Sequence, residues 1–129
     1  MPAASAVRVL VVDDQLTSRM LIREGLQQIG ITHIEMAKDG EEGLKIMMTK
    51  PAHLVISDYN MPKLDGIEFL RTVRAHEPIS KAAFIILSGR GDKELVYKAV
   101  RCGVNNYLVK PFTVPALRAQ IEGVIGKLT

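Results

Sequence analysis

Short apolar segments recur along the chain at regular intervals, each of a length typical of a buried β-strand. They occupy residues 7–12, 33–37, 53–57, 83–87 and 107–109. Each is rich in aliphatic residues, and we expect four of the five strands to be covered on both faces. The second, HIEMA, is the least apolar. The pattern predicts five strands.

The stretches between these segments carry apolar residues at the spacing of one helix face. In the first stretch these residues are Leu16, Met20, Leu21 and Leu26. Gly30 and Gly103 lie just beyond two such stretches, where glycine commonly ends a helix. Thr113 can cap a last helix that tolerates Pro115 in its first turn. Five helices therefore alternate with the strands.

Strands that alternate with helices predict the α/β class, with a five-stranded, doubly wound parallel sheet flanked by five helices. The chain has 129 residues, which fits one domain of ordinary size. We expect residues 7–129 to form this domain and residues 1–6 to be a flexible tail.

The composition argues against several classes of protein. Hydrophobic residues make up 47% of the chain and charged residues 24%, as in a globular protein with a real core. The net charge of +3 is spread among interleaved acids and bases, so we expect no nucleic-acid partner. Cys102 is the single cysteine and cannot form an internal disulfide. No apolar run approaches membrane-spanning length, and we expect a cytoplasmic protein without membrane contact.

Acidic residues stand at the ends of two predicted strands. Asp13 and Asp14 follow the first strand, and Asp58 follows the third. In such sheets ligands bind outside the carboxyl ends of the strands. Two carboxylates about 4 Å apart repel by roughly 4 kcal/mol at an effective dielectric near 20, so an acidic cluster needs a cation, a proton or an offsetting penalty elsewhere. Carboxylate oxygens suit Mg²⁺, which makes a magnesium site the economical interpretation.

Two more polar residues end strands at the same edge. Ser88 follows the fourth strand and Lys110 follows the fifth. A hydroxyl and an ammonium are the groups that hold phosphoryl oxygens, and Asp58 can act as a nucleophile that forms an acyl phosphate. Taken alone, each residue is ordinary, since adjacent acids are common in turns and helix caps. The set of residues together indicates phosphoryl chemistry.

Four fragments in this order, VLVVDD, VISDYNMPKLDGIEFL, FIILSG and YLVKPF, resemble the response-regulator receiver domains, in particular the single-domain chemotaxis regulators. The resemblance covers about residues 7–128. It implies a flavodoxin-like sheet with strand order 2-1-3-4-5. It also implies a stand-alone two-component response regulator, in which Asp58 accepts a phosphoryl group from the phosphohistidine of a sensor kinase.

The resemblance implies a ligand set for the metal. Asp14 and Asp58 would bind Mg²⁺ directly, together with the backbone carbonyl of Asn60. Asp13 would act mainly through bound water. No other cofactor is implied.

The resemblance also implies roles for residues around the phosphoryl group. Ser88 and Lys110 would contact its oxygens, and Tyr107 would be the aromatic switch that turns inward when the hydroxyl of Ser88 moves. Asn60 and Arg90 match positions that tune the lifetime of the acyl phosphate. The protein would catalyse its own phosphorylation and dephosphorylation without being an enzyme in the usual sense.

The implied output is a change in affinity for a partner protein. The surface would be formed by the fourth helix, fifth strand and fifth helix, including Val96, Val100 and Tyr107. A chemotaxis-type sensor kinase and the flagellar motor switch are the expected partners, and the protein is expected to be a monomer. Because the chain ends after the fifth helix, we expect no attached output domain. A phosphorelay carrier or phosphate sink is a close alternative.

Two further classes fit the sequence less well. A haloacid-dehalogenase-like phosphatase also uses an aspartyl phosphate, but its nucleophile follows the first strand in a D-x-D-x-T arrangement. Here Asp13 and Asp14 are adjacent, and the candidate nucleophile Asp58 follows the third strand. A flavin or nucleotide binder needs a phosphate loop after the first strand, where DDQLTS places two anions instead.

Overall fold

A computed structural model describes residues 2–89 and 93–129 and places five strands in one parallel sheet. The strands are β1 (Arg8–Val12), β2 (His33–Ala37), β3 (Leu54–Asp58), β4 (Ala83–Ser88) and β5 (Asn106–Val109). Their order in the sheet is β2-β1-β3-β4-β5, and each neighbouring pair is parallel. The predicted strands and the predicted strand order are confirmed.

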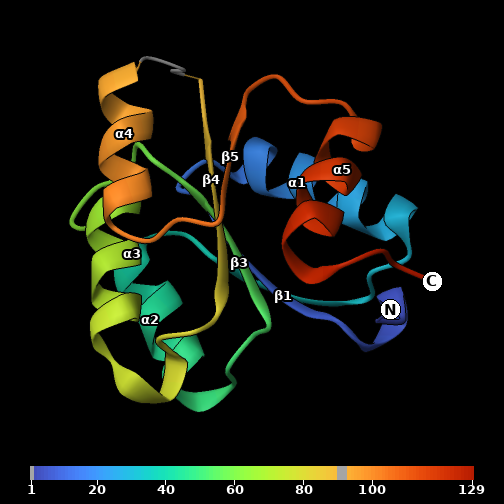
Figure 1. Ribbon diagram of the computed structural model, residues 1–129, viewed down its shortest axis with the longest axis horizontal. Coiled ribbons are helices and arrows are strands. Elements are labelled where there is room, and N and C mark those ends of the chain that lie inside the picture. Colours follow the sequence, from blue (N-terminus) through green and yellow to red (C-terminus); the bar gives the residue numbers. More distant parts are fainter. Residues whose placement is uncertain (1, 90–92) are drawn as a thin grey trace.

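Helices cover both faces of this sheet (Figure 1). They are α1 (Leu16–Ile29), α2 (Gly40–Thr49), α3 (Gly66–Ala75), α4 (Lys93–Arg101) and α5 (Val114–Ile125), with short 3-10 helices at η1 (Ala4–Ala6) and η2 (Glu77–Ile79). Figure 1 shows α1 and α5 on one side, and α2, α3 and α4 on the other. Over the described ranges, no helix is both long enough and apolar enough to cross a membrane. The doubly wound α/β class is confirmed.

The sheet divides the core into two hydrophobic clusters. Successive side chains of a strand point to opposite faces. Val9 and Val11 therefore join the cluster on the side of α1 and α5, whereas Leu10 and Val12 join the cluster on the side of α2, α3 and α4. All four are almost completely buried, which explains why β1 is aliphatic from Val9 to Val12.

Local side-chain and backbone chemistry fixes the helix ends, at Gly30 and Thr113 as predicted. Gly30 ends α1 in the left-handed conformation, with φ of 103°. Thr113 caps α5, since its side chain accepts a hydrogen bond from the N–H of Ala116. Asp65 begins α3 in a capping box, in which its side chain and that of Glu68 each accept the other's backbone N–H.

One face of α1 differs from the expected pattern. The buried residues include Ile22, Leu26 and Ile29, whereas Leu16 and Leu21 are 62% and 56% exposed. Ile22, Leu26 and Ile29 are spaced four and three residues apart, so they form one stripe of the helix, and this stripe faces the sheet. Leu16 and Leu21 lie outside this stripe. The helix was predicted correctly, but part of its predicted buried face was wrong.

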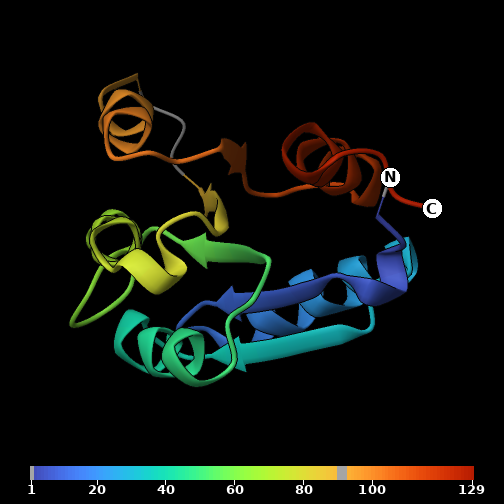
Figure 2. The same ribbon diagram turned by 60° about the horizontal axis from the view of Figure 1, so that its bottom comes forward.

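Two residues of the flexible tail expected over residues 1–6 pair with the far end of the chain. Ala4 is buried, and its N–H donates to the backbone oxygen of Thr129 over 3.1 Å. The N–H of Thr129 in turn donates to the oxygen of Pro2 over 3.0 Å. Figure 2 shows the two ends of the chain side by side. Backbone pairing between the termini holds Ala4 in its buried position, while Ala3, Ser5 and Ala6 stay exposed.

Candidate functional site

Three carboxylates meet at the carboxyl end of the sheet. Asp13 and Asp14 follow β1, and Asp58 is the last residue of its neighbour β3. One oxygen from each of the three side chains lies within 4.8 Å of the others. Asp13 is completely buried, Asp58 is 7% exposed and Asp14 is exposed. The predicted acidic cluster is therefore present, with one open side.

Lys110 brings a positive charge to the cluster from the end of β5. Its Nζ lies 3.0 Å from Oδ2 of Asp13 and 3.3 Å from Oδ1 of Asp58. The backbone holds it there, because its N–H donates to the oxygen of Ser88 over 2.7 Å. The next peptide bond, to Pro111, is cis. The ends of three parallel strands thus bring two buried carboxylates and an ammonium into contact.

The environment changes the pKa of both charged partners. Burial raises the pKa of Asp58, and the charge of Asp13 raises it further, against the opposing effect of Lys110. Burial alone would lower the pKa of Lys110, but its hydrogen bond to Asp13 and the charges of Asp58 and Asp13 outweigh burial and raise it. Lys110 therefore stays charged, while the ionised form of Asp58 is disfavoured until more positive charge arrives.

Asp13 is fixed by the first turn of α1. Its Oδ1 accepts the N–H of Gln15 over 3.0 Å, and its Oδ2 accepts the hydroxyl of Ser18 over 2.5 Å. Arg19 donates to its backbone oxygen over 2.6 Å. Ser18 also accepts a hydrogen bond from Nζ of Lys110 over 2.9 Å. Ser18 and Arg19 were missed from sequence; polar residues about one turn beyond the paired acids were the available signal.

The backbone of Asp58 is enclosed by the start of α3. Its oxygen accepts the hydroxyl of Ser57 over 2.9 Å, and the N–H of Gly66 donates to the oxygen of Tyr59 over 2.8 Å. A Cβ at Gly66 would lie 2.5 Å from the oxygen of Asp58, so only glycine fits without a shift. Asp65 and Gly66 therefore start α3 close against the end of β3.

The remaining predicted site residues differ in how far they are buried. Ser88 ends β4 and is 3% exposed. Asn60 is exposed in the loop after β3. Tyr107 in β5 is half-buried and packs against the cluster on the side of α2, α3 and α4. Arg90 lies outside the described residues.

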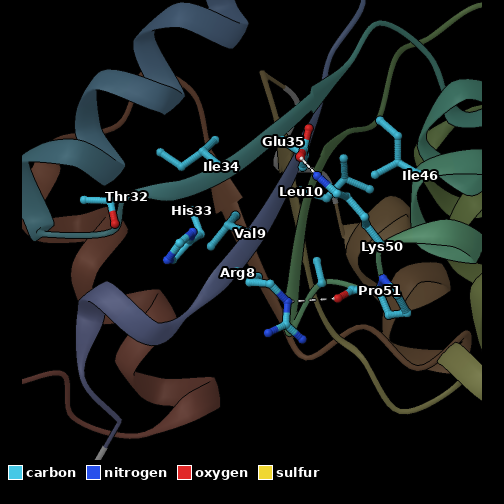
Figure 3. A pocket seen from close by; sticks show the side chains of 11 residues that line it. Arg8, Val9, Leu10, Thr32, His33, Ile34, Glu35, Ile46, Lys50 and Pro51 are labelled. Atoms are coloured by element: carbon cyan, nitrogen blue, oxygen red, sulfur yellow. Dashed lines mark hydrogen bonds and ion pairs between the residues drawn. The ribbon is translucent and has the colours of Figure 1, made fainter.

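A hollow of about 430 Å³ lies at the opposite end of the sheet (Figure 3). Arg8 and His33, the first residues of β1 and β2, line it. Its charged groups are already engaged, since Lys50 pairs with Glu35 over 3.2 Å and Arg8 donates to the oxygen of Pro51 over 3.3 Å. Three carboxylates and an ammonium converge only at the carboxyl end among the described residues, so we place the chemistry there.

The strand order and this constellation match a known family. The chain matches the response regulator receiver domain family over residues 9–122. It belongs to that family. The receiver domain is 53% identical over 128 residues to the "Probable chemotaxis protein CheY" of Rhizobium etli, and the match covers 99% of both chains.

Solved structures of chemotaxis regulators have the same fold. The response regulator CheY2 of Sinorhizobium meliloti, solved in a BeF₃-activated form with Mg²⁺, is 53% identical with a TM-score of 0.75 over 100% of both chains. CheY4 of Vibrio cholerae is 30% identical with a TM-score of 0.87, over 92% of this chain and 98% of that one. This receiver domain is therefore similar to chemotaxis response regulators.

The donor set of the receiver domain fits a divalent cation. Three carboxylates face one ammonium, so the site keeps an excess of negative charge. All the candidate ligand atoms are oxygens, which magnesium prefers, and the exposed side of Asp14 leaves room for water. Asp13, Asp14 and Asp58 are the side chains that could hold the ion.

Proposed function

We propose that this receiver domain accepts a phosphoryl group on Asp58 from the phosphohistidine of a sensor kinase, in a Mg²⁺-dependent reaction. One observation carries the proposal: the carboxylate of Asp58 shares an edge of the sheet with two further carboxylates and lies 3.3 Å from Nζ of Lys110. A buried carboxylate between a cation site and an ammonium is suited to attack an anionic phosphorus centre.

In the proposed step, an oxygen of Asp58 forms a bond to phosphorus while the bond from phosphorus to the histidine nitrogen breaks. The histidine nitrogen keeps the electron pair and takes up a proton. Lys110 and the hydroxyl of Ser88 donate to the equatorial oxygens, where negative charge spreads in the transition state. Bound Mg²⁺ would neutralise charge on the phosphoryl oxygens and the carboxylates. Hydrolysis of the acyl phosphate would return Asp58 to its resting form.

The proposed metal ligands are the carboxylates of Asp13, Asp14 and Asp58 and the backbone carbonyl of Asn60. Asp13 already accepts hydrogen bonds from its own helix and from Lys110, which suits a role through bound water. The Sinorhizobium meliloti relative was solved with Mg²⁺, which supports this choice of ion.

We further propose that phosphorylation is read by a partner protein on the face formed by α4, β5 and α5. Large apolar side chains are exposed there, with Tyr97 at 66%, Val100 at 60% and Val109 at 45%. In this proposal Ser88 moves toward the phosphoryl group and Tyr107 turns inward. Asn60 and Arg90 tune the lifetime of the acyl phosphate. The flagellar motor switch is the proposed partner of a monomeric, cytoplasmic protein.

Intact mass spectrometry tests the reaction. The wild type and Asp58→Asn would be incubated with phosphoramidate, with Mg²⁺ or with EDTA. We expect one phosphoryl adduct on the wild type with Mg²⁺ only, and none on Asp58→Asn. No adduct on the wild type, together with no Mg²⁺-dependent binding of beryllofluoride, would contradict the proposal. The protein would then be a binding module independent of phosphorylation.

A phosphate sink or relay carrier remains the second candidate function, and binding separates the two. An output regulator changes its affinity for the motor switch when beryllofluoride occupies the site, whereas a sink does not. The exposed apolar residues on α4 and β5 favour the output role. Membership of the receiver family does not favour the phosphatase alternative.

A further inference from the structure

The hydroxyl of Ser18 lies between two charged groups of the site. Its Oγ is 2.5 Å from Oδ2 of Asp13 and 2.9 Å from Nζ of Lys110. The same two partners are 3.0 Å from each other. The three groups therefore form a closed triangle of hydrogen bonds at the edge of the site.

The direction of these hydrogen bonds follows from the donors available. An ammonium only donates and an ionised carboxylate only accepts, while a hydroxyl does both. Ser18 must therefore donate its single proton to Asp13 and accept one from Lys110. The ammonium has three protons, and three acceptors surround it: Asp13, Ser18 and Asp58. Ser18 is therefore the third of the acceptors that fix the position of the Lys110 ammonium.

We propose that Ser18 is a positioning residue, which holds the ammonium of Lys110 between Asp13 and Asp58 before the phosphoryl group arrives. The inference rests on the proposed function, because a held ammonium matters only if Asp58 reacts. It extends that function to a residue of α1 that lies 92 positions from Lys110 in the sequence.

Lys110 needs such a restraint because water can reach it. Its side chain is 25% exposed, and lysine carries its charge on a flexible four-carbon stem. Lys110 and Ser18 also line a hollow of about 530 Å³ between α1 and the residues that follow β5, together with Leu21 and Phe112. Without the hydroxyl, water from this hollow would compete for the ammonium.

Core packing and hydrogen bonds fix the backbone of Ser18 relative to Asp13. Ile22, one turn further along α1, is completely buried in the core. Asp13 is tied to the same helix by the N–H of Gln15 and by Arg19. The distance between Ser18 and Asp13 is therefore set by the fold, whereas the position of the Lys110 ammonium at the end of its four-carbon stem depends on its hydrogen bonds.

The variants separate positioning from a structural effect on the helix. Ser18→Ala removes the hydroxyl and leaves a good helix former. Ser18→Thr keeps a hydroxyl at the same atom. Thr17→Ala is the matched control, because Thr17 is exposed on the same turn of α1. Circular dichroism would verify that each variant is folded.

The first measurement follows the ammonium directly, without a phosphodonor. In ¹⁵N-labelled protein, the Nζ signal of Lys110 is assigned by its loss in Lys110→Arg, and the exchange of its protons with water is measured. One lost hydrogen bond to a charged group, shared among three acceptors, predicts about fivefold faster exchange in Ser18→Ala. Ser18→Thr and Thr17→Ala should match the wild type. Unchanged exchange in Ser18→Ala would overturn the inference.

The second measurement is the rate of adduct formation from phosphoramidate with saturating Mg²⁺. We expect Ser18→Ala to react about fivefold more slowly, with Ser18→Thr restoring most of the rate. Faster exchange with an unchanged rate would overturn the positioning role. If the wild type forms no adduct, the proposed function fails, while the exchange measurement still decides whether Ser18 holds Lys110. If the wild type reacts and Ser18→Ala matches it in both measurements, only the inference on Ser18 fails.

Discussion

Removing the charge of Asp58 is expected to stabilise the protein in the absence of Mg²⁺. Burial and the charge of Asp13 both raise the pKa of Asp58, which means that the folded protein disfavours its ionised form. Asp58→Asn removes the charge but keeps the size of the side chain and an oxygen that Lys110 can reach. We therefore expect the ionised carboxylate of Asp58 to lower the free energy of unfolding when Mg²⁺ is absent.

The size of the stabilisation expected for Asp58→Asn follows from the charges in the cluster and from the burial of Asp58. The three carboxylates have oxygens within 4.8 Å of one another. At an effective dielectric of about 20, each pair at that distance repels by about 3.5 kcal/mol. Attraction between Asp58 and Lys110 at 3.3 Å amounts to about 5 kcal/mol on the same scale. Repulsion by buried Asp13 offsets most of this attraction, and burial of the Asp58 charge, the largest cause of its raised pKa, turns the balance against the ionised form, so we expect a gain of about 1–2 kcal/mol.

The assay is urea denaturation followed by far-UV circular dichroism, since the chain has no tryptophan. In EDTA at pH 7, Asp58→Asn should be the more stable protein. The free energy of unfolding of the wild type should rise with Mg²⁺, by about 2.7 kcal/mol at 100 times the dissociation constant, and that of the variant much less.

The stability difference between Asp58→Asn and the wild type should change with pH in a definite direction. An acid whose pKa is higher in the folded than in the unfolded state costs stability above that pKa. The advantage of Asp58→Asn should therefore shrink as the pH falls from the raised pKa of Asp58 toward its ordinary value of 3.8, because the protonated carboxyl carries no charge.

Glu77→Gln is the control, because it removes an exposed carboxylate from η2, which precedes the amino end of β4. We expect its stability to change by less than about 0.5 kcal/mol. If Asp58→Asn is less stable than the wild type in EDTA, the electrostatic reasoning is wrong. An equal gain in Glu77→Gln would also refute it, since the effect would then be one of net charge.

Three further predictions test the surroundings of the site. Gly66→Ala should lose roughly 2 kcal/mol in urea denaturation or more, because its Cβ would lie 2.5 Å from the oxygen of Asp58. Thr113→Ala should lose about 1 kcal/mol by the same assay through loss of the cap of α5, whereas Thr113→Ser should not. Lys110→Gln should remain folded but form the phosphoramidate adduct at least tenfold more slowly in the mass assay, since it lacks the ammonium beside Asp58.

The sequence predicts the sheet well because its signal is local. Each strand is a short apolar run, and the helix ends at Gly30 and Thr113 depend on neighbouring backbone alone. The exposed positions of Leu16 and Leu21 could not be predicted, because one helical pattern allows more than one buried stripe and tertiary packing selects it. The buried position of Ala4 depends on a backbone hydrogen bond to Thr129, at the far end of the chain, which no local pattern shows.

The residues of the candidate site could likewise be predicted only in part from the sequence. Asp13, Asp14, Asp58 and Lys110 could be predicted to meet because parallel strands bring their carboxyl ends to one edge. Ser18 could not, because a serine in the first turns of a helix is unremarkable by itself. Its importance comes from two hydrogen bonds, one of them to a residue on a distant strand end.

Chemical trapping of the acyl phosphate tests the central claim most directly. The wild type would be incubated with phosphoramidate and Mg²⁺ and then reduced with borohydride, which converts an aspartyl phosphate to homoserine. Peptide sequencing by mass spectrometry would locate the product. We predict homoserine at position 58 only, and none when EDTA replaces Mg²⁺. Homoserine at Asp13 or Asp14, or none anywhere in a protein that carries the phosphoryl adduct, would contradict the assignment of Asp58 as the phosphoacceptor.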